Sequence, residues 1–232
     1  MTEYSSYLKS MQSHQKSGNK LVKLVKKVSV GSAMLMAIAA IACSTPILPV
    51  RASLFDGPVD SLPSWQRDSL RNGQTVVTGE QGQYVARVLV AASPDVVWQV
   101  LTDYANLSKF IPNMTSSRIL ENYGSSKVVE QIDSRQVFLF PVISRTKLAI
   151  QETDRERIDF SLIDGDLSTM EGYWKMESVS SVPGRPANQI LITYSVNAQP
   201  NGSTPIDAFY GIFKEALNET LQAIKQEVSY RN

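Results

Sequence analysis

The side chains that carry most enzyme chemistry are scarce in this chain of 232 residues. It contains one histidine, His14, and one cysteine, Cys43, and both lie in its first fifty residues. The rest of the sequence has no imidazole base and no thiolate, which excludes Ser-His-Asp and Cys-His catalysis there. It also has no nitrogen or sulfur ligand for zinc and no cysteine for a disulfide. We therefore expect no catalytic residue, no metal site and no cofactor in this part of the chain.

Two groups of carboxylates are alternatives for acid–base chemistry. Asp164-Gly165-Asp166 places two acids close together, but an Asp-Gly pair between alternating segments is typical of a hairpin turn. Glu171 lies three positions before Trp174, an odd spacing that places the two side chains on opposite faces of a strand. We interpret both groups as structural. An enzyme built on this sequence would need carboxylate, tyrosine or arginine groups that point inward, such as Tyr84 or Tyr194.

The first fifty residues differ in composition from the rest. Residues 1–27 hold six lysines and a single acid, and residues 28–50 carry no charge. Followed by the small residues of Val50-Arg51-Ala52, this order is typical of a secretory signal peptide. We predict a signal peptide over residues 1–52 and export of the remainder. Two alternatives stay open: residues 28–50 are long enough for a membrane anchor, which takes about 20 residues, and Cys43 is a candidate for lipidation.

Charge and length describe the remainder as an ordinary folded domain. Residues 1–52 hold seven of the 23 lysines and arginines but one of the 22 acids, so without them the net charge is −5 rather than +1. Mixed charges with a slight acidic excess argue against nucleic acid as a partner. We predict a linker over residues 53–74, with a short helix that Ser64 caps, and a single domain over residues 75–230.

The pattern of apolar residues predicts the order strand, two short helices, six strands and a long helix. Residues 75–92 alternate in their second half and are expected to form one long strand. Ser93-Pro94-Asp95 is typical of a helix start, and the second short helix ends before Pro112. Residues 115–200 contain alternating segments separated by turns, which indicates six antiparallel strands with one apolar face each.

The final helix is the best-defined element. Thr204, Pro205 and Asp207 are typical of a helix start, and the apolar residues from Ile206 to Val228 recur at intervals of three and four. Burial of each large apolar side chain contributes roughly 1.5–3 kcal/mol. This helix is therefore expected to pack against the sheet.

Two stretches resemble a known family. VLVAASPDVVWQVLTDYANLSKFIPNM (88–114) is similar to the first strand, paired helices and proline stop of START-like proteins of the polyketide cyclase/dehydrase group (SRPBCC superfamily). LSTMEGYWKME (167–177) is similar to the glycine-x-tryptophan strand of that group, at Gly172 and Trp174. The resemblance covers about residues 75–230 and extends to the coenzyme Q-binding START-like proteins, in exported forms from photosynthetic bacteria.

The resemblance implies an α+β helix-grip fold, in which a curved antiparallel sheet of about seven strands surrounds the long C-terminal helix. It also implies an apolar cavity between sheet and helix that holds a lipid, an isoprenoid quinone or another hydrophobic molecule. The residues expected to line this cavity are Tyr84, Phe110, Ile111, Met114, Phe160, Trp174, Tyr194, Phe209 and Phe213. Three of them, Phe110, Ile111 and Met114, cluster around Pro112, where they form either a gate of the cavity or a plug of a solid core.

The expected function is the binding and carriage, or chaperoning, of a hydrophobic molecule by a protein that is not an enzyme. Its expected partners are that ligand and, as an alternative, a membrane surface. The expected location is the periplasm or a thylakoid lumen. Two other functions stay open: a cyclase or dehydratase that acts on a polyketide-like substrate, and an assembly factor with a filled core and no ligand.

Overall fold

The computed structural model describes residues 57–137, 140–202 and 205–232. The predicted signal peptide, Cys43 and the expected cap residue Thr204 lie outside these ranges. The strands are β1 (Val76–Glu80), β2 (Gln83–Val90), β3 (Met114–Tyr123), β4 (Ser126–Val137), β5 (Phe140–Thr153), β6 (Arg157–Gly165), β7 (Leu167–Val179) and β8 (Gln189–Pro200). They form one sheet in the order β1-β2-β8-β7-β6-β5-β4-β3, and neighbouring strands are antiparallel.

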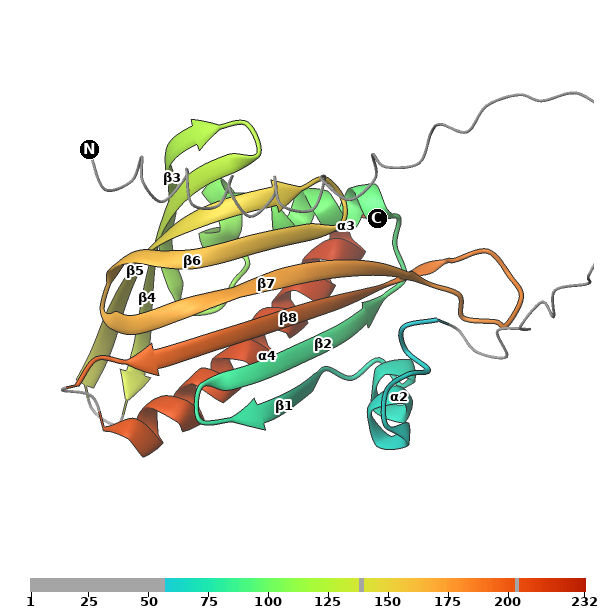
Figure 1. The fold of residues 1–232 in the computed structure, drawn as a ribbon, viewed down its shortest axis with the longest axis horizontal. Coiled ribbons are helices and arrows are strands. Elements are labelled where there is room, and N and C mark those ends of the chain that lie inside the picture. The colour runs from blue at the N-terminus through green and yellow to red at the C-terminus, as the bar shows by residue number, and fades with distance from the viewer. Residues whose placement is uncertain (1–56, 138–139, 203–204) are drawn as a thin grey trace, which may run out of the picture. The chain divides into compact units, whose positions relative to one another are not determined.

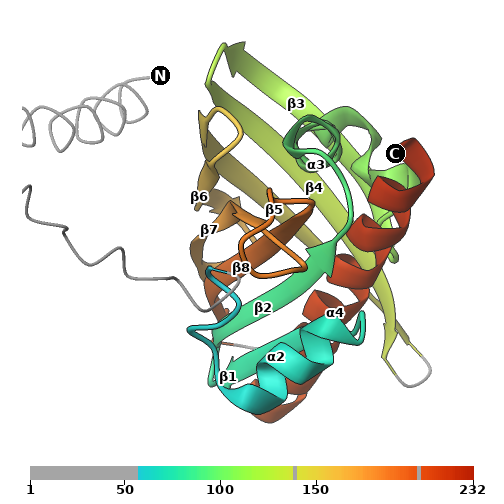
Figure 2. The same ribbon diagram turned by 90° about the vertical axis from the view of Figure 1, so that its right-hand side faces the viewer.

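The long helix α4 (Ile206–Arg231) lies on the concave side of this sheet (Figure 1, Figure 2). The arrangement confirms the predicted α+β helix-grip fold. It also confirms that six consecutive strands, β3 to β8, connect the short helices to the long one.

The described sheet has eight strands, one more than the number predicted. Residues 75–92 form the hairpin of β1 and β2 instead of one long strand. Gln81 and Gly82 have φ angles of 52° and 88°, and positive φ at both central residues is what a type I′ turn requires. The expectation of a single strand was wrong because this turn places a non-glycine residue in a conformation that such residues rarely adopt.

The shorter helices of the described chain are α2 (Ser64–Arg71), α3 (Pro94–Leu101) and the 3-10 helix η1 (Tyr104–Lys109). Ser93 caps α3 as predicted, because its hydroxyl accepts a hydrogen bond from the backbone nitrogen of Val96 (3.4 Å). The prediction that Ser64 caps the first of these helices is wrong. Ser64 is the first helical residue, and Pro63 occupies the cap position without a side-chain hydrogen bond.

The concave face of the sheet forms the main core together with α4. The register places Ala86, Tyr194 and Trp174 side by side on neighbouring strands, so these positions mark the inward face. Inward side chains of the sheet join side chains of α3, η1 and α4 in one hydrophobic cluster, which includes Val88 and Leu221. We call the region between the concave face and α4 the interior.

A smaller hydrophobic cluster lies on the opposite, convex side of the sheet. Leu70 of α2 packs there with Val76, Leu89 and Leu191, which are buried. Helix α2 therefore covers the convex face where β1, β2 and β8 meet, and it leaves the interior to α4.

Gly172 of β7 is required by the close approach of β8. A Cβ atom at this position would lie 2.0 Å from the backbone oxygen of Ser195 and 2.9 Å from the Cζ atom of Phe160. We expect Gly172→Ala to lower the free energy of unfolding by about 2–4 kcal/mol, because β7 and β8 would have to separate. Urea unfolding followed by circular dichroism measures this loss.

Gly211→Ala in α4 is the matched control. A Cβ atom at Gly211 would meet nothing within 4 Å, and alanine favours a helix over glycine by about 1 kcal/mol. We expect this variant to be as stable as the parent or more stable. Equal stability of the two variants would contradict the role given to Gly172.

Candidate ligand-binding site

Helix α4 packs closely along one flank of the sheet. Its backbone approaches β1, β2 and α3 most closely, and Figure 2 shows α4 running alongside β2. On the other flank, the carboxylate of Glu219 on α4 pairs with Arg135 of β4 (2.9 Å) and accepts a hydrogen bond from the amide of Asn113, just before β3 (3.4 Å). On that flank the backbones of the sheet and α4 therefore lie farther apart, and side chains connect them.

Large apolar side chains of the interior remain half-buried, although a solid core would enclose them completely. They are Met114, Leu162, Met170 and Trp174 on the sheet, and Phe209 and Phe213 on α4. Each packs against the buried core and keeps part of its surface exposed. The interior therefore offers apolar surface that a hydrophobic ligand can cover.

All nine residues predicted to line a cavity belong to the hydrophobic cluster of the interior, where they form three groups. In the first group, Trp174 stacks on Tyr194 with a centroid distance of 3.9 Å and an interplanar angle of 3°. The ring of Phe160 lies 5.6 Å from that of Tyr194. These three rings make a continuous aromatic wall on β6, β7 and β8.

The second group lies near the start of α4. The ring of Phe213 is 6.0 Å from that of Tyr84 on β2 and 5.4 Å from that of Phe209. Tyr84 is buried, whereas Phe209 and Phe213 are half-buried. This group brings the hairpin of β1 and β2 into contact with the first turns of α4.

The third group surrounds Pro112, near the end of α4. Ile111 is buried, whereas Phe110 and Met114 are half-buried. The guanidinium carbon of Arg231 lies 5.7 Å from the centroid of the Phe110 ring, and Arg231 pairs with Asp103 (2.9 Å). These contacts hold the turn against the last turn of α4.

A buried polar network closes this end of the interior. The hydroxyl of Tyr104 donates to Glu152 (2.9 Å), whose other oxygen pairs with Lys127 (2.7 Å). The side chains of Lys127 and Glu152 are 13% and 12% exposed. Burial, reinforced by the negative charge of Glu152, raises the pKa of Tyr104. Ile111 is buried beside this network, and whether Phe110, Ile111 and Met114 form a gate or a plug stays a prediction.

Asp133 places a carboxyl group in the apolar interior. It is paired with Met114 across β3 and β4, and it lies two positions from Arg135 on the same strand. Burial raises the pKa of Asp133 to about 6, and the charge of Arg135 opposes this shift. The described residues provide no hydrogen bond that stabilises the charged form. The hydroxyl of Tyr194 is in a similar position, because burial and the charge of Asp133 raise its pKa without a hydrogen bond.

The sequence did not lead us to Asp133, Arg135 or Glu219 as site residues. Along β4, Val129 of the core is followed on the same face by Gln131, Asp133 and Arg135. This change from apolar to polar residues along one face of β4 is visible in the sequence and marks the strand as a candidate for site residues. It does not distinguish a strand that leaves the core from one that places polar groups inside it.

The carboxylates that the sequence offered for catalysis lie outside the interior. Strand β6 ends at Gly165 and β7 begins at Leu167, so Asp164-Gly165-Asp166 forms the predicted turn. Arg145 contacts both acids, through its guanidinium group to Asp164 (3.1 Å) and its backbone nitrogen to Asp166 (2.7 Å). Glu171 is exposed, as predicted. The described ranges contain no cluster of side chains able to hold a metal ion and no helix with the length and hydropathy of a membrane span.

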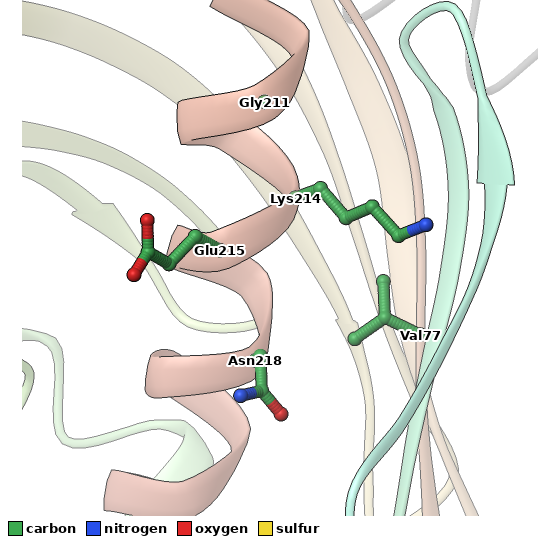
Figure 3. Close-up of a pocket in the computed structure, with 5 residues that line it drawn as sticks. All are labelled: Val77, Gly211, Lys214, Glu215 and Asn218. Carbon is green, nitrogen blue, oxygen red and sulfur yellow. The ribbon is translucent and has the colours of Figure 1, made fainter.

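A separate, open groove of about 370 Å³ lies between β1 and α4. The residues that line it are Val77, Gly211, Lys214, Glu215 and Asn218. Figure 3 shows Lys214 extending toward β1 and Glu215 pointing away from it. The groove is open and three of its five lining residues carry charged or amide groups, so the apolar interior is the better candidate for a hydrophobic ligand.

Residues 90–225 match the sequence model of a family described as polyketide cyclase / dehydrase and lipid transport. The chain belongs to this family. The description names both enzymes and lipid transport, which agrees with an interior that combines apolar walls and a few polar groups. A search of curated proteins gives no match.

Solved structures support the same fold. A START superfamily protein from Mycobacterium smegmatis is 18% identical, with a TM-score of 0.52, and the match covers 69% of this chain and 100% of that one. A STAR-related lipid transfer protein from Xanthomonas axonopodis is 16% identical, with a TM-score of 0.52 and coverages of 67% and 92%. A protein from Thermus thermophilus is 13% identical, with a TM-score of 0.50 and coverages of 63% and 94%. At these identities the similarity shows the START-like fold.

Asp133→Asn tests the position of the carboxyl group. The folded protein binds the Asp133 proton at a higher pH than the unfolded chain, so the parent loses stability as the pH rises from about 4 to about 6. We expect the variant to raise the free energy of unfolding by about 1–3 kcal/mol at pH 7.5. Most of this gain should be gone at pH 4. Urea unfolding at the two pH values measures it.

Glu171→Gln is the control, because Glu171 is an exposed carboxylate. We expect it to change the free energy of unfolding by less than about 0.5 kcal/mol at both pH values. If Asp133→Asn destabilised the protein at pH 7.5, a stabilising partner of the charged carboxylate would have to exist.

Proposed function

We propose that this family member binds a hydrophobic small molecule, an isoprenoid quinone or another lipid, in the interior and carries or chaperones it. The observation that carries this proposal is the half-buried apolar surface that faces the interior, from Met170 on β7 to Phe209 and Phe213 on α4. Covering such surface contributes roughly 25 cal/mol per Å². The family description, which includes lipid transport, supports the same function.

The flank of β3 and β4 is the proposed route into the interior. Glu219 crosses this flank by pairing with Arg135 and Asn113. The side chains of Arg135 and Glu219 are 19% and 33% exposed, and an ion pair that solvent reaches contributes little to stability, about 0–1 kcal/mol. These polar contacts can therefore separate to admit a ligand while the packing of α4 on β1 and β2 stays in place.

A cyclase or dehydratase is the second candidate function, and one observation favours it. Asp133 and Tyr194 are titratable groups in an apolar site, and such sites are where acid–base residues acquire altered pKa values. The family description also names polyketide cyclases. An enzyme would convert an added poly-β-ketone, whereas a carrier would bind or ignore it without turnover.

We also propose that the chain is exported to the periplasm or a thylakoid lumen and contacts a membrane surface when it loads or delivers its ligand. The composition of residues 1–52 supports export. Cell fractionation with N-terminal sequencing tests it: cleavage would leave Ser53 as the first residue. An intact N-terminus in the membrane fraction would instead support residues 28–50 as an anchor.

Organic extraction of the purified full chain, followed by lipid mass spectrometry, tests carriage. We expect a hydrophobic compound that co-purifies in near-stoichiometric amount, because the apolar surface of the interior favours ligand retention. A protein that yields no such compound and binds no added lipid would contradict carriage and would favour an assembly factor.

Met170→Trp tests whether the interior has room for a ligand. A larger side chain in a solid core costs about 1–3 kcal/mol, whereas in an open interior it can fill space. We expect the variant to keep its melting temperature within a few degrees and to lose most of its bound or added lipid. Thermal unfolding and mass spectrometry provide the two readouts.

Glu171→Trp is the matched control, because Glu171 is the next residue of β7 and is exposed on the other face. It adds a similar ring outside the interior and should leave the lipid content unchanged. A strongly destabilised Met170→Trp protein with an unchanged control would show a solid core.

A further inference from the structure

The hairpin of β4 and β5 extends beyond both of its neighbours in the sheet. Strand β3 begins opposite Asp133 of β4, and β6 ends opposite Thr146 of β5. Beyond these positions, residues 134–137 and 140–143 have each other as their only strand partners in the described sheet. They form a two-stranded ribbon that projects past the other strands (Figure 2).

Apolar side chains are exposed on both faces of this ribbon. Val142 is 51% exposed and Ile143 is 65% exposed. Because successive residues of a strand point to opposite faces, these two side chains lie on opposite sides of the ribbon. The sequence of residues 137–143, VFLFPVI, contains no polar side chain. A strand that packs on one protein surface buries one face, whereas this strand needs apolar surroundings on both.

The start of α4 presents a further exposed apolar side chain at the same end of the molecule. Ile206, the first residue of α4, is 58% exposed. Figure 1 shows that α4 begins at the end of the sheet toward which β4 runs. The ion pair of Arg135 and Glu219, which crosses the proposed route into the interior, connects the ribbon to α4. We call Val142, Ile143 and Ile206 the apolar rim.

The charged side chains around the apolar rim have an acidic excess. Arg135 already pairs with Glu219. Arg145, at the base of the ribbon, pairs with two carboxylates (2.8 and 3.1 Å). Asp166, just after β6, and Asp207, in the first turn of α4, add two exposed carboxylates. This part of the described surface therefore repels anions and complements a partner without net negative charge.

We propose that the apolar rim docks on a lipid bilayer whose head groups carry no net charge. This inference rests on the proposed carrier function and names the surface through which the protein meets a membrane. The fluid interface between head groups and acyl chains can surround both faces of the ribbon. A protein partner would need a separate matching pit for each projecting side chain.

The depth of docking is limited by the backbone of the ribbon. Its outer edges carry N–H and C=O groups that no third strand pairs, and such groups cannot enter the hydrocarbon core without a large cost. The rim therefore stays at the interface, where water still reaches the backbone. Docking there brings the flank of Arg135 and Glu219 close to the lipid that the interior is proposed to take up.

A fluorophore at position 143 tests this proposal in the full chain. Cys43→Ser removes the single cysteine, and Ile143→Cys provides a site for the environment-sensitive dye NBD. The labelled protein is mixed with phosphatidylcholine vesicles that contain a nitroxide on an acyl chain. We expect a blue shift and at least about twofold quenching of the dye by the nitroxide, because the label enters the interface.

The matched control carries the dye at position 123. Tyr123 is 63% exposed and lies on the hairpin of β3 and β4, at the other end of β4. We expect the Tyr123→Cys label to show neither the blue shift nor the quenching. Because both labels report on the same full chain, the comparison holds even if residues 1–52 themselves bind the vesicle.

Two further changes test the chemistry of docking. Val142→Asp combined with Ile206→Asp should weaken vesicle binding of the 143 label at least about tenfold, because two large apolar side chains no longer leave water. Adding phosphatidylglycerol to the vesicles should leave the quenching unchanged or reduce it. High salt should not weaken it, because no ion pair with lipid contributes.

The outcomes separate this proposal from the carrier function. A 143 label that responds no more than the 123 label would overturn the docking surface, and docking that requires phosphatidylglycerol would overturn the class of lipid. A blue shift without vesicles that disappears on dilution would assign the apolar rim to a second copy of the chain instead. In each case the carrier function stands if lipid is still recovered by organic extraction. If the 143 label does not respond and no lipid is recovered or bound, both are wrong.

Discussion

The structure depends on a difference between the two flanks of the sheet: one packs closely against α4, and the other contacts it through polar side chains. Apolar side chains such as Leu221 and Ile224 are buried, and the helix packs closely on β1 and β2. On the flank of β3 and β4 the helix is reached by polar side chains, through Glu219. If both flanks packed as tightly, Met170, Phe213 and their neighbours would be fully enclosed, and the interior would have no apolar surface to offer.

The sequence predicted the elements whose signals are local. The long helix follows from its three–four periodicity, and the capped start of α3 follows from Ser93-Pro94-Asp95. The break between β1 and β2 was harder to predict, because Gln81 adopts a positive φ, which is rare for glutamine. Gly82 was the available signal, since an isolated glycine in an alternating pattern often marks a break.

The candidate site was harder to predict because it depends on contacts between distant segments. The aromatic residues could be assigned to the interior from alternation, yet their division into three groups follows from the register and from the position of α4. The importance of Asp133 follows from its burial, which raises its pKa and depends on segments far from β4 in the sequence. No pattern within β4 alone distinguishes Asp133 from an acidic residue at the solvent-exposed end of a strand.

Polar groups of the interior fall into two kinds. Tyr104, Lys127 and Glu152 satisfy one another, so their burial holds η1 in place at one end. Asp133 and Tyr194 have no hydrogen-bonding partner among the described residues, and burial raises the pKa of both. The first kind stabilises the fold, and the second leaves hydrogen-bonding capacity that the described residues do not use.

The parallel stack of Trp174 on Tyr194 has a spectroscopic consequence. The indole of Trp174 lies flat on the phenol ring of Tyr194, which is buried in the interior, so its emission depends on the environment of that ring. Trp65, by contrast, is largely exposed on α2 at the convex face. Trp98 of α3 also packs against the interior cluster, so we expect a ligand in the interior to change the emission of Trp174 and Trp98 without any added label.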